Sequence, residues 1–153
     1  MYKKILVAID GSEVGDAAFE SAMQLAKAEN AELFALYVIE YPKLYIPDAS
    51  GYDPAPIYDA LTEEGARITQ QTGDRMKANG INGKSGVVDN FFTGNTTAEQ
   101  IEHTADTFGA DLVVLGTHGR SGFKRLMLGS VAEAVTRMST RPVLLVPYKR
   151  ADA

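Results

Sequence analysis

The sequence contains no cysteine and only two histidines, His103 and His118. The absence of cysteine excludes a disulfide framework, a thiolate metal site and a cysteine nucleophile. Structural zinc sites draw mainly on cysteine and histidine, so two histidines leave too few ligands for such a site. We therefore predict a chain that folds on its hydrophobic core alone, with no metal site built from protein ligands.

Long apolar runs are also missing. The apolar stretch at the N-terminus ends at Asp10, which is too short for the apolar region of a secretion signal. No segment approaches the roughly 18 consecutive apolar residues of a membrane span, and the chain has neither an internal repeat nor a low-complexity tract. At 153 residues the chain is long enough for one core. We expect a single domain over residues 1–153, a cytoplasmic location and no membrane partner.

Basic side chains are scarce in most of the sequence. Residues 1–116 carry 8 basic and 18 acidic side chains, whereas residues 117–153 carry 7 basic and 2 acidic ones, and the net charge is −5. The acidic part would repel a nucleic acid backbone, so we expect no nucleic acid partner, while the basic C-terminal part suits a small anion. The simpler alternative is that these basic side chains are ordinary solvated surface.

Apolar runs alternate with helical patterns along the chain. Continuous apolar runs of strand length indicate strands buried on both faces, separated by segments with helical spacing. We expect strands at 3–9, 31–40, 84–90, 110–116 and 141–147, with helices after Ser12, at 57–78, from Thr96 or Thr97 to Phe108, and from Ser130. Parallel neighbours need crossover connections, so the pattern predicts a doubly wound α/β fold: an open parallel sheet with helices on both faces. In such folds, ligands bind beyond the carboxyl ends of the strands, where the strand order reverses.

Residues 42–56 form the longest segment with no strand or helix pattern. They hold four of the six prolines, which predicts a long loop. Loops of this length often carry function, so the segment is a candidate lid or contact surface. Tyr41, Tyr45 and Tyr52 in or beside it would cover a ligand or a partner; packing on the protein surface explains them equally well.

Glycines cluster after the fourth expected strand, in the pattern Gly-x2-Gly-x9-Gly-Ser formed by Gly116, Gly119, Gly129 and Ser130. The first amides of a helix have no helical acceptor and lie at its positive end, and a preceding glycine lets an anion approach them. A polyphosphate would then lie across the amides of Gly119, Gly129, Ser130 and Val131, with its base on apolar walls such as Val7 and Val38. The alternative is a strand exit, a turn and an ordinary helix cap.

Together these segments resemble the universal stress proteins of the UspA type, in their ATP-binding branch. The similarity rests on KKILVAIDGSE, LYVIE, ADLVVLGTHGRSGFKRLMLGSVAEAV and RPVLLVP, and it covers nearly the whole chain. The resemblance implies a Rossmann-like five-stranded sheet of order 3-2-1-4-5, ATP or a related nucleotide at the switch point, and a homodimer paired through the fifth strands. By position, it implies that Ala8, Ile9, Asp10 and Val38 border the adenosine, and that Gly116, Gly119, Gly129, Ser130 and Val131 border the sugar and phosphates. Relatives often carry Ser or Thr where this chain has Ala132.

Three further residues of the fourth loop, Thr117, His118 and Arg120, complete the candidate site. His118 would donate to a phosphate or act as an acid, but a loop histidine is more often a solvent-exposed turn residue. Asp10 would bond a ribose hydroxyl or hold a phosphate-bound Mg²⁺. Its alternative role is to start the following helix.

No nucleophile, base and orienting group form a set in the sequence, so we predict binding and assign no catalytic residue. The leading hypothesis is a dimeric stress-response regulator that binds ATP, ADP or AMP, with Mg²⁺ held mainly by the phosphates. The apolar fifth strand between two prolines is an edge that invites pairing with a second copy. One alternative is an interaction protein that acts through its dimer and residues 42–56 without nucleotide. The other is a slow ATPase or phosphotransferase that uses the basic loop around Arg120, Lys124 and Arg125.

Overall fold

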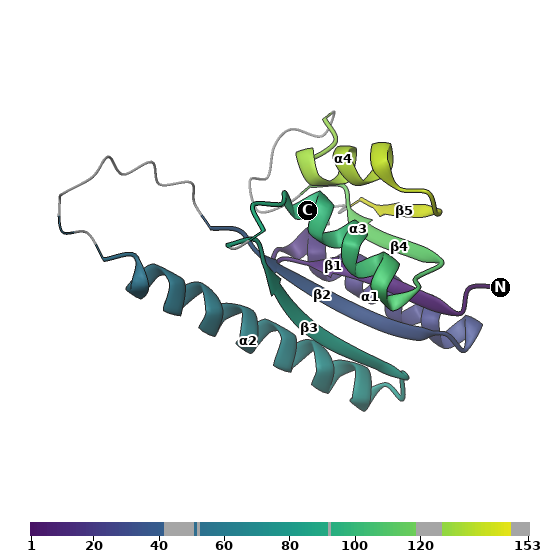
Figure 1. The fold of residues 1–153 in the computed structure, drawn as a ribbon. Helices are drawn as coiled ribbons and strands as arrows, with labels where there is room; N and C mark the ends of the chain where they lie inside the picture. Colours follow the sequence, from purple (N-terminus) through teal and green to yellow (C-terminus); the bar gives the residue numbers. More distant parts are fainter. Residues whose placement is uncertain (42–50, 52, 92, 119–126, 148–153) are drawn as a thin grey trace, which may run out of the picture.

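The computed structural model describes residues 1–41, 51, 53–91, 93–118 and 127–147, and these form a single parallel sheet with helices on both faces (Figure 1). The strand order is β3-β2-β1-β4-β5, which confirms the predicted fold class. The strands are β1 Lys4–Ile9, β2 Glu32–Ile39, β3 Gly83–Asp89, β4 Leu112–Gly116 and β5 Val143–Val146. The helices are α1 Glu13–Glu29, α2 Ala55–Ala78, α3 Thr97–Phe108 and α4 Ser130–Met138. All four strand pairings are parallel.

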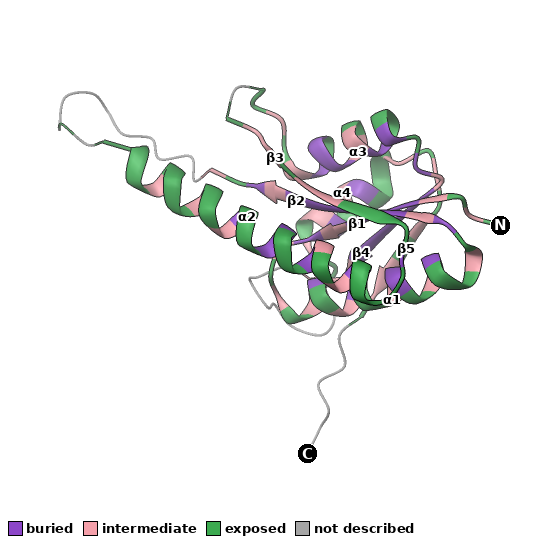
Figure 2. Cartoon of the chain, turned by 90° about the horizontal axis from the view of Figure 1, so that it is seen from below, coloured by how far each residue is buried: buried purple, intermediate pink, exposed green. Residues whose placement is uncertain are grey.

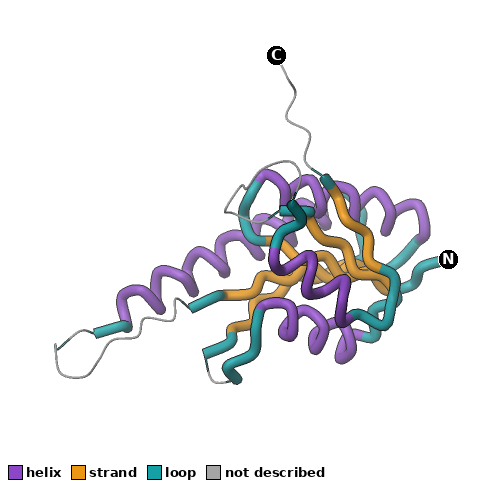
Figure 3. Tube along the Cα trace, turned by 90° about the horizontal axis from the view of Figure 1, so that it is seen from above, coloured by secondary structure: helices purple, strands orange, loops and turns teal. Residues whose placement is uncertain are grey.

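Two hydrophobic clusters lie on opposite faces of the sheet, because successive side chains of a strand point to opposite faces. Ile5, Val7 and Ile9 of β1 belong to the cluster under α1 and α2, whereas Leu6 belongs to the cluster under α3 and α4. Figure 3 shows the strands between these helical layers, and in Figure 2 the central strands are mostly buried. The central strands therefore consist of continuous apolar residues.

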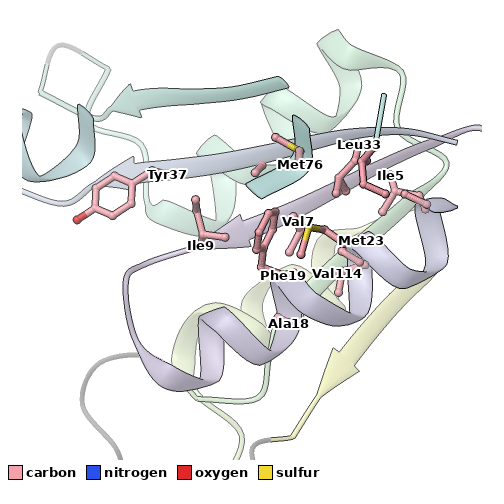
Figure 4. Packing of buried hydrophobic residues seen from close by; sticks show 14 of the residues in the cluster. Ile5, Val7, Ile9, Ala18, Phe19, Met23, Leu33, Tyr37, Met76 and Val114 are labelled. Atoms are coloured by element: carbon pink, nitrogen blue, oxygen red, sulfur yellow. The ribbon is translucent and has the colours of Figure 1, made fainter. Parts of the chain in front are cut away.

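The first cluster is centred on α1. Phe19 and Met23 project from α1 onto Val7 and Ile5 of the sheet, and Met76 joins them from α2 (Figure 4). Phe19 and Met76 are almost completely buried. The cluster fixes α1 over β1 and β4, whose carboxyl ends border the site described below.

Three of the four predicted helix starts, those of α1, α3 and α4, are confirmed at single-residue level. Ser12 is the N-cap of α1 and its hydroxyl accepts from Gly15 N at 3.0 Å. Thr96 caps α3 in a capping box with Glu99, and Ser130 is the first residue of α4. Such caps depend on neighbouring residues alone, so the sequence predicts them well.

Helix α2 differs from its predicted extent of 57–78, because it begins at Ala55 and runs unbroken through both of its internal glycines. Gly65 lies against the ring of Tyr37: a Cβ on Gly65 would be 3.2 Å from Tyr37 Cδ1. The glycine thus permits close packing on the sheet. The N-terminal part of α2 extends past the end of the sheet (Figure 1).

Strand β1 has β2 on one side and β4 on the other, so the strand order reverses at the carboxyl ends of β1 and β4. Ile5, Leu6 and Val7 pair with Leu112, Val113 and Val114, respectively. The segments after Ile9 and after Gly116 consequently leave the sheet side by side. Among the described helices, none is long and apolar enough to cross a membrane.

Candidate functional site

A cavity of about 390 Å³ opens at this switch point, beyond the carboxyl ends of the strands, and residues of both hydrophobic clusters line it. Ten of the twelve predicted site residues line it: Ala8, Ile9, Asp10, Val38, Gly116, Thr117, His118, Gly129, Ser130 and Val131. The other two, Gly119 and Arg120, lie outside the described residues, as do Lys124 and Arg125 of the basic loop. Residues far apart in the sequence thus meet at one cavity.

The N-terminus of α4 forms one end of the cavity. The first helical hydrogen bond runs from Glu133 N to Gly129 O at 2.9 Å, so the N–H groups of Ser130, Val131 and Ala132 have no helical acceptor. Gly129 is the N-cap, and it has no side chain to accept from them. In helices α1 and α3, in contrast, a side chain accepts from one amide of the first turn: Ser12 accepts from Gly15 N, and Thr96 accepts from Glu99 N. The amides and the positive helix end together suit an anion.

One predicted phosphate donor has a different partner. The Gly129 amide donates to Thr117 O at 2.7 Å, and the Thr117 amide donates to Val146 O at 3.1 Å. Gly129 N–H is therefore occupied within the protein, and the prediction that a phosphate accepts from it is wrong for this structure. The two bonds tie the start of α4 to the end of β4 and to β5.

Gly116 is a glycine for a reason other than the predicted approach of a phosphate. A Cβ at this position would lie 2.6 Å from Val14 Cγ1 and 3.1 Å from Val14 O. The first turn of α1 therefore presses on the end of β4 too closely for any side chain there. Gly116 lines the cavity, but helix packing accounts for its missing side chain.

Asp10 organises the turn before α1 as well as lining the cavity. Its Oδ1 accepts from Ser12 N at 3.0 Å and from the Ser12 hydroxyl at 2.5 Å. This is the local role that the sequence offered as the alternative to ribose or Mg²⁺ binding. The carboxylate combines it with a place on the cavity wall.

His118 is partly buried beside Thr117. The Thr117 hydroxyl and His118 Nδ1 are 2.9 Å apart, and His118 Nε2 is buried with no hydrogen-bond partner among the described residues. The ring is therefore not the solvent-exposed turn residue that the sequence offered as an alternative. Within the described part of the chain, no three His, Asp or Glu side chains gather in a group able to hold a metal ion.

Two residues that line the cavity were missed by the sequence reasoning. Glu40 follows β2 and Thr97 begins α3; both line the cavity, and the Thr97 hydroxyl donates to Glu40 Oε1. Further apolar walls come from Leu36, Leu61, Ile101 and Leu115. The strand order β2-β1-β4 could have indicated Glu40, because it brings the residues that follow β2 to the same edge of the sheet as those that follow β1 and β4.

The expected apolar wall at Val7 is wrong. Val7 is fully buried in the cluster under α1 and α2, on the far side of the sheet. The next residue, Ala8, lines the cavity in its place. Ile9, on the same face as Val7, also lines the cavity because it is the last residue of β1.

Tyr41 packs beside the cavity without lining it. Its ring stacks on Tyr58 with centroids 5.2 Å apart and meets the edge of Phe91 at 5.3 Å. The Tyr41 hydroxyl has no hydrogen-bond partner among the described residues, and burial raises the pKa of Tyr41 to about 12. Surface packing thus explains Tyr41, while Tyr45 and Tyr52 lie outside the described residues.

Comparison with known proteins gives consistent similarities. A sequence model described as "Universal stress protein family" matches residues 1–147. Universal stress protein YxiE of Bacillus subtilis (strain 168) is 33% identical, with the alignment covering 95% of this chain and 99% of that protein. A crystal structure of a protein from the universal stress protein family of Burkholderia pseudomallei is 35% identical, with a TM-score of 0.78 over 96% of this chain and 97% of that one. A universal stress protein crystallised in complex with cAMP is 28% identical, with a TM-score of 0.68 over 95% and 97% of the two chains.

Proposed function

The chain belongs to the universal stress protein family, and from that premise we propose that its switch-point cavity binds an adenine nucleotide, ATP or its shorter forms ADP and AMP. One observation carries the proposal: the uncapped N-terminus of α4 opens into a cavity whose remaining walls are mostly apolar. A phosphate needs the amides, and a base needs the apolar walls. The structural neighbour that binds cAMP supports the adenine nucleotide class.

In this proposal the phosphates accept from the amides of Ser130, Val131 and Ala132 and from the Ser130 hydroxyl, and His118 Nε2 stands beside them. The base rests on Ala8 and Val38, and Asp10 is within the sugar region. Gly119 and Arg120 remain proposed members of the phosphate site. Mg²⁺ would be held mainly by the phosphates. The helix holds these amides in place before the ligand arrives, so the site can bind phosphate without rearranging. The proposed binding involves no catalytic group.

Isothermal titration calorimetry on protein stripped of co-purified nucleotide tests the proposal. We expect saturable binding of ATP with Mg²⁺, and of ADP and AMP. Ser130→Pro removes one amide while proline remains acceptable at the first position of a helix. The extended backbone of Gly129 (φ −60°, ψ 153°) also suits a residue that precedes proline.

Ser130→Ala is the matched control, because it loses the hydroxyl and keeps the amide. We expect Ser130→Pro to bind more weakly than Ser130→Ala by roughly tenfold or more, the loss of one hydrogen bond to a charged group. If the unaltered protein does not bind nucleotide at millimolar concentration, the better-supported function is that of an interaction protein that acts without nucleotide. Equal affinities of the two variants would show that the α4 amides do not bind the phosphates.

We further propose that the protein is a homodimer paired through β5 and that nucleotide occupancy regulates its partners. Strand β5 is an edge strand of the sheet, Leu144 is 39% exposed, and an open apolar edge invites pairing. The bond from Thr117 N to Val146 O links this edge directly to the cavity wall. Leu144→Glu should give a monomer by sedimentation velocity at micromolar concentration. A monomeric unaltered protein would contradict the dimer.

A further inference from the structure

We propose that the open edge of β3 is a docking surface for a partner protein, which adds an extended segment to the sheet as a further strand. Strand β3 lies at one edge of the sheet, beside α2 (Figure 1). The partner is recognised as a strand: its backbone bonds to the edge, and its apolar side chains pack at the carboxyl end of β3. The inference is independent of the nucleotide site, so its test uses no nucleotide.

Every second residue of β3 directs its backbone N–H and C=O groups away from the sheet. Strand β3 pairs with β2 in parallel, and the Leu33 amide of β2 donates to Asn82 O at 2.9 Å. Alternate residues of a parallel strand bond to the same neighbour, so the even-numbered residues of β3 bond to β2. Among the described residues, the outward groups have no hydrogen-bond partner; they belong to Gly83, Ser85 and Val87.

Strand β3 lacks the features that usually protect an edge strand, which are proline, a bulge or a charged side chain across the edge. It contains no proline, and its seven residues pair with β2 in an unbroken register. Its lysine lies over the sheet: Lys84 Nζ is 5.2 Å from the ring centroid of Phe34 and 5.1 Å from that of Phe108. The edge is therefore open to an added strand.

Apolar side chains are exposed at the carboxyl end of the same edge. Val87 of β3 is 38% exposed, Phe91 after β3 is 57% exposed, and Tyr58 of α2 is 37% exposed. The rings of Phe91 and Tyr58 are in contact, with centroids 6.0 Å apart. A Cβ on Gly65 would lie 3.4 Å from Val87 Cγ1, and Gly65 follows Tyr58 on the same face of α2, two turns later. The three exposed side chains thus form one patch on the α2 side of the edge.

This patch selects a partner of different sequence over a second copy of the chain. Two copies related by a two-fold axis would pair their β3 strands antiparallel. The start of one strand, Gly83 and Lys84, would then lie opposite the end of the other, near Val87 and Phe91. Glycine and lysine would leave the patch uncovered, whereas a segment with β-branched or aromatic residues at this place covers it.

A strand-forming probe peptide tests the docking surface. The probe is a fluorescein-labelled peptide of about eight residues that alternates threonine with valine and carries one central phenylalanine. We expect saturable binding by fluorescence anisotropy. Hydrogen exchange at the outward amides of Ser85 and Val87 should be fast in the free protein and slow in the complex. The amides of Gly86 and Val88, which bond to β2, should be protected in both states.

Two variants of Val87 separate backbone pairing from side-chain packing. Val87→Pro removes an outward amide and keeps the ladder to β2, a position at which an edge strand accepts proline. Val87→Ala is the matched control, because it loses the same side chain but keeps the amide. We expect Val87→Pro to bind the probe roughly fivefold more weakly than Val87→Ala, the size of one neutral hydrogen bond. Protection of the Gly86 amide in both variants would show that the sheet is retained.

A second pair of variants tests the patch even if the proline variant misfolds. Phe91→Ser removes a largely exposed ring and should weaken probe binding. Met138→Ser removes an exposed apolar side chain from α4, away from β3, and should leave binding unchanged.

Three outcomes would overturn the proposal. No binding of the probe at millimolar concentration would show that the edge does not accept a strand. Equal binding by the unaltered protein, Val87→Pro and Phe91→Ser would place the probe elsewhere on the molecule. Protection of the Ser85 and Val87 amides that rises with the concentration of the free protein would show that a second copy occupies the edge.

Discussion

Replacing Gly129 with aspartate should stabilise the fold and weaken nucleotide binding at the same time. Gly129 is the N-cap of α4 with φ −60° and ψ 153°, an extended conformation that any residue adopts, and it makes no side-chain cap. An aspartate at an N-cap accepts from the second or third amide of its helix, here Val131 or Ala132. It also places a negative charge at the positive helix end. The variant would thus fill the anion site with its own carboxylate.

Both magnitudes follow from the local geometry. Aspartate in place of a glycine N-cap contributes a few tenths of a kcal/mol, and the charge near the helix end adds about 0.3–1 kcal/mol. We therefore expect the free energy of unfolding to rise by about 0.5–1.5 kcal/mol. Losing one amide hydrogen bond to a phosphate weakens binding by about 10- to 100-fold, and repulsion between carboxylate and phosphate increases that loss.

Two companion variants separate the causes. Gly129→Asn caps the same amides without a charge, and Gly129→Ala adds a methyl group without a cap. Urea unfolding should rank aspartate and asparagine above alanine in stability, and calorimetry with AMP should rank aspartate below asparagine in affinity. A Gly129→Asp protein that is stabilised yet binds AMP as tightly as the unaltered protein would refute the reasoning. An amide that donates to the aspartate side chain cannot at the same time donate to the phosphate.

Three other predictions concern stability. Gly116→Ala should lower the free energy of unfolding by about 1–3 kcal/mol, measured in urea, because its Cβ would lie 2.6 Å from Val14 Cγ1. Burial raises the pKa of Tyr41 from 10.0 to about 12. The stability that neutral Tyr41 contributes below pH 10 should therefore be lost as the pH rises through 12. Tyr41→Phe should lack this loss in alkaline unfolding, and identical pH profiles of the two proteins would contradict the prediction. The Arg141 side chain, 12% exposed, pairs with that of Glu102, 14% exposed. Arg141→Ala should therefore lower the free energy of unfolding by about 3 kcal/mol, measured in urea or by heating. A decrease below about 0.5 kcal/mol would show that the two residues form an ordinary surface pair.

Much of the fold was predictable because its signals are local. Buried parallel strands require continuous apolar runs, and helix starts require side chains that accept from nearby amides. The strand at 3–9, the caps at Ser12 and Thr96 and the start of α4 at Ser130 agree with the structure to within a residue. The family resemblance supplied the strand order, which no local signal contains.

The candidate site was predictable only in outline. The glycine pattern indicated the loop after β4, but two of its glycines play different parts: Gly116 makes room for Val14, and the Gly129 amide bonds to Thr117. Neither Val14 nor Thr117 signals such a contact in the sequence. A glycine shows that backbone comes close to something, and only the assembled neighbours show what that is.

The sequence by itself determined the order and kind of the elements, because propensity, capping and apolar periodicity act between residues a few positions apart. The tertiary structure decided which side chains share a space: Ala8 and not Val7 on the cavity wall, and Glu40 beside Thr97, 57 positions apart. These contacts depend on the face to which a strand residue points and on which strands are neighbours. Both are properties of the assembled sheet, since non-local contacts exist only once the chain has brought its distant parts together.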